Sequence, residues 1–107
     1  EMCNMKLRGK QKRYLRSEAH HLKPIFQIGK DGLSEVWLDE VLKALDKREL
    51  LKVNILQNSL VEVEDVKEFI ENNSDAQVIQ TIGNVLVLFK KSDKAENQKI
   101  SVKVAEL

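Results

Sequence analysis

The sequence predicts an α+β fold, in which helices pack on a small mixed β-sheet as a two-layer α/β sandwich. Stretches with helical periodicity alternate along the chain with short apolar stretches that are typical of strands. Such strand-helix-strand units favour parallel pairing through right-handed crossovers. Near the end, residues 76–82 and 85–89 flank Gly83-Asn84, a pair that suits a two-residue turn and predicts an antiparallel hairpin. Parallel and antiparallel pairs together require a mixed sheet.

The first helix is expected over residues 10–22, because Leu15, Ala19 and Leu22 recur at helical spacing before Pro24. Ser34 suits the N-cap of the second helix. The remaining elements are expected as strand 25–28, helix 34–47, strand 50–56, helix 61–72, strand 76–82 and strand 85–89. The last strand is apolar at every position, so we expect it inside the sheet, covered on one face and partly on the other.

The chain end is expected to lie outside this domain. Residues 92–99 (SDKAENQK) are interpreted as a solvated linker, and the following ISVKV alternates with period two, which predicts either an edge strand or a loose end. We therefore expect a basic extension at residues 1–7, whose EMCN start is interpreted as a remnant of recombinant production. One domain at 8–91 and a tail at 92–107 complete the chain.

Composition and charge narrow the class of partner. A chain of 107 residues with 42% apolar content can bury one core without disulfides, and the single Cys3 cannot form an internal bridge. Residues 1–30 carry eight Lys or Arg against two acids, whereas residues 31–80 carry five against twelve. A basic end of this kind predicts a polyanionic partner. No apolar stretch has membrane-spanning length, so we expect a cytoplasmic protein with no membrane partner.

A glycine pair stands between the first strand and the second helix, in the stretch IFQIGKDGLS. Gly29 and Gly32 enclose Lys30 and Asp31. Such glycines serve either a plain turn or the close approach of another molecule, and N–H groups at a helix start can donate to phosphate. The Asp31 carboxylate would repel phosphate unless it turns away. The spacing matches neither a nucleotide-triphosphate loop nor a dinucleotide fingerprint, which favours contact with a polymer backbone.

The first helix also carries a basic face. Five side chains fall on an arc about 100° wide beside the apolar stripe: Lys12, Arg13, Arg16, His20 and Lys23. This face is either a solvated surface or a cationic surface shared with Lys30 and extended by Lys6 and Lys10. The side on which Lys90 and Lys91 emerge is not determined by the sequence.

Three sequence blocks together resemble a known family. KQKRYLRSEAHHLKPIFQIGKDGLSE, ELLKV and QTIGNVLVLFK resemble the CRM domain of YhbY-like RNA-binding proteins over residues 8–91. The family's GxxG loop corresponds to residues 29–32. Its LRxxAHxLxP motif corresponds to Leu15, Arg16, Ala19, His20, Leu22 and Pro24.

The resemblance implies a four-stranded sheet similar to that of the C-terminal domain of translation initiation factor three. It also implies an RNA partner: ribosomal RNA in large-subunit precursors for single-domain bacterial members, or group II intron RNA for plant organellar relatives. We expect RNA contacts from Gly29, Lys30, Asp31, Gly32, Lys10, Lys12, Arg13, Arg16, His20, Lys23, Lys90 and Lys91.

Other functions have weaker support in the sequence. His20 and His21 are adjacent and would point about 100° apart on a helix, so we expect no metal, no cofactor and no catalysis. Trp37 is interpreted as half-buried core rather than a base-stacking residue. The main alternative is a protein-interaction module whose acidic residues, such as Glu64, Glu68 and Glu71, dock a basic ribosomal or translation partner. An enzyme would require a deep polar pocket. We expect a monomer.

Overall fold

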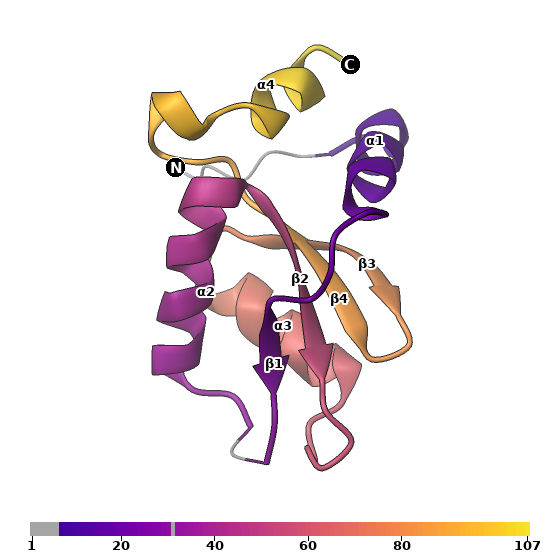
Figure 1. Ribbon diagram of the computed structural model, residues 1–107, viewed down its shortest axis with the longest axis vertical. Helices are drawn as coiled ribbons and strands as arrows, with labels where there is room; N and C mark the ends of the chain where they lie inside the picture. Colours follow the sequence, from indigo (N-terminus) through magenta and orange to yellow (C-terminus); the bar gives the residue numbers. More distant parts are fainter. Residues whose placement is uncertain (1–6, 31) are drawn as a thin grey trace.

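A computed structural model describes residues 7–30 and 32–107 and shows a four-stranded sheet with strand order β1-β2-β4-β3 (Figure 1). The elements are α1 (Gly9–Ala19), β1 (Phe26–Ile28), α2 (Glu35–Arg48), β2 (Leu50–Ile55), α3 (Val63–Asn73), β3 (Gln77–Ile82), β4 (Val85–Phe89), a 3-10 turn (Ala95–Asn97) and α4 (Ile100–Ala105). β1 runs parallel to β2, and β4 runs antiparallel to both β2 and β3. The predicted α+β class and mixed sheet are confirmed.

β4 lies inside the sheet and is buried from both sides. Leu86 and Leu88 belong to one buried cluster, whereas Val87 and Phe89 belong to another. Because side chains alternate along a strand, these two clusters lie on opposite faces of the sheet. The continuous apolar run VLVLF is therefore explained by cover on both faces.

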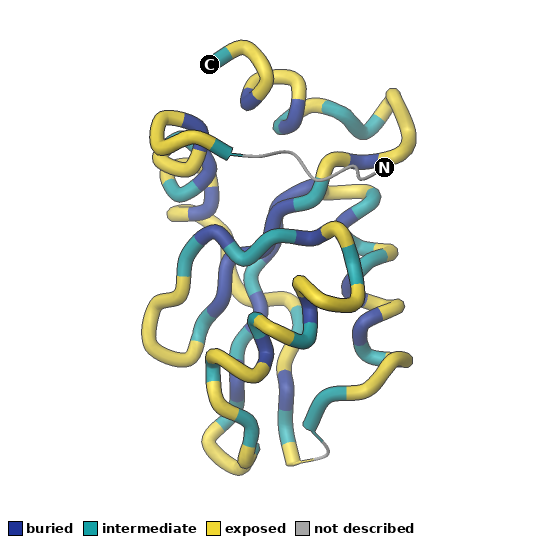
Figure 2. Tube along the Cα trace, turned by 180° about the vertical axis from the view of Figure 1, so that it is seen from behind, coloured by how far each residue is buried: buried dark blue, intermediate teal, exposed yellow. Residues whose placement is uncertain are grey.

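Each face of the sheet is covered by different helices (Figures 1 and 2). α2 and α3 supply Leu38, Val41, Leu45, Val66 and Ile70 to the larger cluster. α1 and α4 cover only one end of the opposite face, where Leu15, Ala19 and Val104 pack on the second cluster. The Gln11 side chain joins these two helices by donating from Nε2 to the carbonyl of Val104 at 2.9 Å. The other half of this face stays open.

Two helix ends differ from the prediction. α1 ends at Ala19, three residues early, and Leu22 is 37% exposed rather than part of the packing stripe. The backbone must leave the helix here because Ile25 N donates to the carbonyl of Lys52 and aligns β1 on β2. α3 begins at Val63 because Asp65 accepts a hydrogen bond from Glu62 N at 3.2 Å, which caps the helix at Glu62.

The expectation that ISVKV forms a loose end or an edge strand is wrong, whereas residues 93–96 before it are exposed, as expected of a solvated linker. Ser92 is 2% exposed, and ISVKV lies in the short helix α4 with Ser101 and Val104 buried. These two positions are three residues apart and face inward together, which is a helical spacing hidden within an apparent alternation. Residues 92–107 therefore pack against the sheet and α2.

The described residues contain no helix with the length and apolar character needed to cross a membrane. Predictions made for Cys3, Lys6 and Asp31 concern positions outside the described residues.

Candidate nucleic-acid interface

The GKDG loop lies at the end of β1, at the lower end of the sheet in Figure 1. Gly32 N donates to the carbonyl of Gly29 at 3.1 Å and closes the turn. Gly32 has φ 72°, and a Cβ there would meet Val61 Cγ2 at 3.4 Å. The left-handed backbone explains glycine at this position, because other residues adopt it only at a cost.

Gly29 is different, because the fold does not require glycine there. Its backbone is not among the positive-φ positions, and an added Cβ would meet Leu56 Cδ1 at 3.5 Å, an ordinary van der Waals contact. Against the described residues other than its chain neighbours, alanine at position 29 would therefore meet no clash. Glycine at this position leaves room for another molecule to approach the backbone closely.

The start of α2 follows the loop and is partly capped by the chain itself. The Ser34 hydroxyl accepts a hydrogen bond from Trp37 N at 3.1 Å, as predicted for an N-cap. The N–H groups of Glu35 and Val36 have no acceptor within a helix, by the geometry of a first turn. Lys30 is exposed and makes no ion pair with another described residue.

Trp37 is part of the core rather than a stacking platform, as interpreted from the sequence. Its side chain packs on the larger buried cluster, and its indole Nε1 donates to the carbonyl of Gln27 at 3.0 Å. This hydrogen bond occupies an acceptor on the free edge of β1, which discourages pairing with another strand.

The two arginines of α1 face a hollow over the open half of the sheet. Its volume is about 440 Å³, and Arg13, Arg16 and His20 line it together with Lys52 of β2 and Gln80 and Ile82 of β3. None of the described residues that line it is acidic. Neither arginine forms an ion pair within the described part of the chain, so both charges are available to a partner.

Lys52 is the cation in this hollow that sequence reasoning missed. Its Nζ donates to the carbonyl of Leu22 at 3.0 Å, which holds the ammonium group beside the connection between α1 and β1. The alternation along β2 could have identified it. Leu51, Val53 and Ile55 face the larger buried cluster, so the positions between them face the open side of the sheet. The sequence alone could not show that α1 covers only part of that side.

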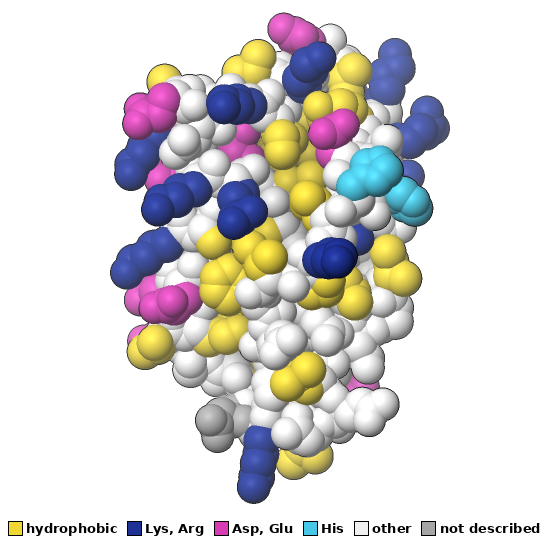
Figure 3. Space-filling model, viewed as in Figure 1, with side chains coloured by type: hydrophobic (Ala, Val, Ile, Leu, Met, Phe, Trp, Pro, Cys, Tyr) yellow, Lys and Arg dark blue, Asp and Glu magenta, His cyan; other side chains and the backbone are white. Residues whose placement is uncertain are grey.

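The predicted residues do not form one continuous cationic patch. Lys10, Lys12 and Lys23 are exposed but do not line the hollow. Lys30 lies beyond the end of β1, two residues after Ile28, and Ile28 is the Cα partner of Ile55 at the end of β2. Three residues separate Lys52 from Ile55, about 10 Å along a strand. Figure 3 shows that the face between α1 and the loop is mostly uncharged.

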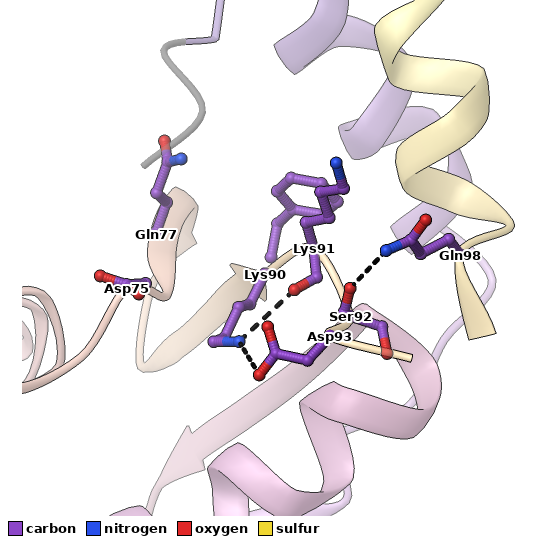
Figure 4. Close-up of a pocket in the computed structure, with 8 residues that line it drawn as sticks. Asp75, Gln77, Lys90, Lys91, Ser92, Asp93 and Gln98 are labelled. Carbon is purple, nitrogen blue, oxygen red and sulfur yellow. Dashed lines mark hydrogen bonds and ion pairs between the residues drawn. The ribbon is translucent and has the colours of Figure 1, made fainter. Parts of the chain in front are cut away.

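Lys90 and Lys91 lie at the opposite end of the sheet from the GKDG loop. They follow Phe89, which pairs with Leu50, the first residue of β2. The Lys90 ammonium lies 3.9 Å from an Asp93 carboxylate oxygen and 3.4 Å from the carbonyl oxygen of Lys91 (Figure 4). This end therefore forms a separate surface.

The pocket in Figure 4, of about 310 Å³, is lined mostly by polar and charged side chains. Its described lining includes the Lys90–Asp93 pair and Gln98, whose Nε2 donates to the carbonyl of Ser92 at 2.7 Å. The Ser92 hydroxyl of this pocket donates to the carbonyl and to a carboxylate oxygen of Asp46, at 2.6 and 3.0 Å, which ties it to the end of α2.

The two histidines and the acidic residues expected to dock a basic partner are exposed. His20 and His21 are exposed just beyond α1, with ring centroids 5.4 Å apart at 81°. The described residues contain no group of three His, Cys, Asp or Glu that could hold a metal. Glu71 accepts a hydrogen bond from Val78 N at 3.0 Å and so supports the fold, whereas Glu64 and Glu68 are exposed.

Comparison with known proteins decides the family. A sequence model of the CRS1 / YhbY (CRM) domain matches residues 7–90, most of the chain. The chain belongs to the CRM domain family. The resemblance inferred from the GKDG loop and the α1 motif is confirmed.

Individual CRM proteins match nearly the whole chain. The protein named Probable RNA-binding protein YqeI of Bacillus subtilis is 49% identical over 96 residues, which cover 90% of this chain and 98% of the relative. A protein of Haemophilus influenzae named RNA-binding protein is 37% identical over 83% of this chain and 90% of its own length. The solution structure of the hypothetical protein SAV1595 from Staphylococcus aureus matches with a TM-score of 0.70 at 38% identity, covering 88% and 98% of the two chains.

Proposed function

We propose that this CRM domain binds RNA and catalyses no reaction. The observation that carries the proposal is Gly29, a glycine that neither backbone conformation nor packing requires, at a loop beside an unpaired lysine. The hollow beside α1 adds unpaired arginines in a setting without acidic side chains, which suits a polyanion. Relatives covering most of this chain are named RNA-binding proteins, which supports the same partner.

Two groups of contacts make up the proposed site. Lys30 and the backbone at Gly29 contact the sugar-phosphate chain at one end of the sheet, while Arg13 and Arg16 contact it at the hollow. Lys10, Lys12, His20 and Lys23 extend the α1 contacts to neighbouring phosphates. Lys90 and Lys91 lie apart, so they contribute only where a second RNA segment reaches the opposite end of the sheet.

The proposed RNA is ribosomal RNA of the large-subunit precursor, bound during ribosome assembly in the cytoplasm by a monomeric protein. This follows the function that the resemblance implies for single-domain bacterial CRM proteins, and this chain covers 98% of one bacterial relative. Neighbouring ribosomal proteins are the natural additional partners.

Competition between RNAs tests this choice of partner. The protein is bound to a labelled fragment of large-subunit ribosomal RNA, and unlabelled fragments of large-subunit RNA, small-subunit RNA and transfer RNA are added in turn. We expect large-subunit fragments to compete at the lowest concentration. Equal competition by all three would contradict the large-subunit assignment and leave general RNA binding standing.

A further inference from the structure

The open half of the sheet carries a row of amide side chains between the hollow and the GKDG loop. Gln27 and Asn54 are Cα partners across β1 and β2. Gln80 lies on β3, and Lys52 and Gln80 are both partners of Val87 on the intervening strand. Asn54 and Ile82 likewise share Val85 as partner.

All three amides face the same side of the sheet as α1. Phe26 and Ile28 pack on the larger cluster, so Gln27 between them points away from it. Val53 and Ile55 are buried in that same cluster, which places Asn54 on the open side. Gln80 lines the hollow directly.

The amides have no structural role that accounts for them. Their side chains make no hydrogen bond with any other residue that the structure describes, and all three positions are exposed or half-buried. An amide group offers both donors and an acceptor, the combination that pairs with base edges. Charged side chains would keep this surface solvated equally well, but among the described open-side positions of β1, β2 and β3 only Lys52 is charged.

The hollow suits nucleotides rather than a duplex. It is an open depression of about 440 Å³ with α1 as a wall on one side, a size comparable to that of a small-ligand site. Watson–Crick edges are accessible to side chains only when bases are unpaired. The arginines and Lys52 at the rim can hold phosphates while bases turn toward the amides.

We propose that the open sheet face is a base-reading site for unpaired RNA, in which Gln80 and Asn54, with Gln27 at its edge, hydrogen-bond to bases. This inference rests on the proposed RNA-binding function and names the form of RNA that the site takes. Phosphate contacts set affinity and salt dependence, whereas the amides set the preference for unpaired bases.

The test compares a short unstructured RNA with the same RNA in a duplex. The unchanged protein is expected to bind the unpaired form at least tenfold more tightly. The variant Asn54→Val/Gln80→Met keeps β-compatible side chains of similar size, and we expect it to lose about tenfold in affinity for unpaired RNA. The duplex affinity and the salt dependence should not change. Thr81→Val, an exposed position on the opposite face of β3, is the matched control.

A second readout does not depend on affinity. In ¹H–¹⁵N spectra, the side-chain NH₂ signals of Asn54 and Gln80 should shift when unpaired RNA is added to the unchanged protein. Equal affinity for the two RNA forms, or unmoved amide signals in the bound state, would overturn the inference and leave RNA binding intact. Binding to neither form would overturn the proposed function as well.

Discussion

The buried carboxylate of Glu49 accepts hydrogen bonds from both the backbone N–H and the hydroxyl of Ser101, at 2.9 and 2.5 Å. The same carboxylate accepts from the N–H groups of Ser92 and Lys99, at 2.8 and 3.0 Å. Glu49 is 0% exposed and caps α2 with φ 64°. One side chain at the end of α2 thus binds three residues of the C-terminal segment, Ser92, Lys99 and Ser101.

Replacing this carboxylate should release the C-terminal segment. In Glu49→Gln, one oxygen becomes an NH₂ group that faces donors, so buried N–H groups lose their acceptor. We expect unfolding free energy to fall by about 3 kcal/mol, and the Ser101 amide to lose protection from hydrogen exchange. Glu40→Gln on the exposed face of α2 is the control and should change stability by less than about 0.5 kcal/mol. Retained protection at Ser101 would contradict the role of Glu49.

The glycines of the chain should respond differently to alanine. Gly32→Ala and Gly83→Ala each place a side chain on a left-handed backbone, and we expect each to cost about 1–2 kcal/mol of stability. Gly29→Ala should leave stability nearly unchanged but weaken RNA binding about tenfold, because its Cβ keeps the RNA backbone away. Denaturant unfolding and RNA titration of the three variants separate the two effects.

Gly83 provides the control for this comparison. It shares positive φ with Gly32 but has open space around it and lies in the β3–β4 turn. Gly83→Ala should therefore be less stable than the unchanged protein. Its RNA affinity, measured well below its unfolding temperature, should be unchanged. Full RNA affinity in Gly29→Ala would remove the observation that carries the proposed function.

Acid should loosen the junction between α2 and the C-terminal segment. The N–H of Asp93 and the Ser92 hydroxyl, at 2.9 and 3.0 Å, lower the pKa of Asp46, with smaller help from Lys94 and Lys90. A carboxyl group whose pKa is lower in the folded than in the unfolded protein stabilises the fold at any pH above its unfolded-state pKa. This stabilisation is lost as the pH falls through the pKa of the folded state. The loss should therefore occur below about pH 4, the usual region for aspartate.

The variant Asp46→Asn checks this assignment. Its stability should be lower than that of the unchanged protein at pH 7, and the difference should shrink as pH falls below about 4. Thermal unfolding from pH 7 to pH 2 measures both curves, with Asp39→Asn on the exposed face of the same helix as control. A stability difference between Asp46→Asn and the unchanged protein that stays constant with pH would contradict the role of the Asp46 carboxylate.

Local signals were sufficient to predict most of the fold. The Gly83-Asn84 turn, the Ser34 cap and the apolar β4 each specify their element within a few residues. The C-terminal segment was misjudged because its structure depends on Glu49, some 50 residues away, rather than on its own pattern. A buried carboxylate cannot be distinguished from a solvated one by its neighbours in sequence.

The candidate site was only partly predictable for a similar reason. The GKDG loop and the basic face of α1 are contiguous in sequence and were found there. Lys52 and Gln80 join Arg16 only because β2 and β3 pass beneath an incomplete cover of helices. The side on which Lys90 emerges depends on strand order, which the sequence leaves open.

Salt-dependent binding of an unpaired large-subunit ribosomal RNA fragment tests the central claim most directly. The unchanged protein is compared with Arg16→Glu/Lys30→Glu and with Lys99→Glu/Lys103→Glu, which makes the same charge change at exposed positions in the C-terminal segment. We expect only the first variant to lose affinity, with the slope of log affinity against log salt reduced by about two. Equal losses in both variants, or none in the first, would contradict a site formed by the GKDG loop and α1.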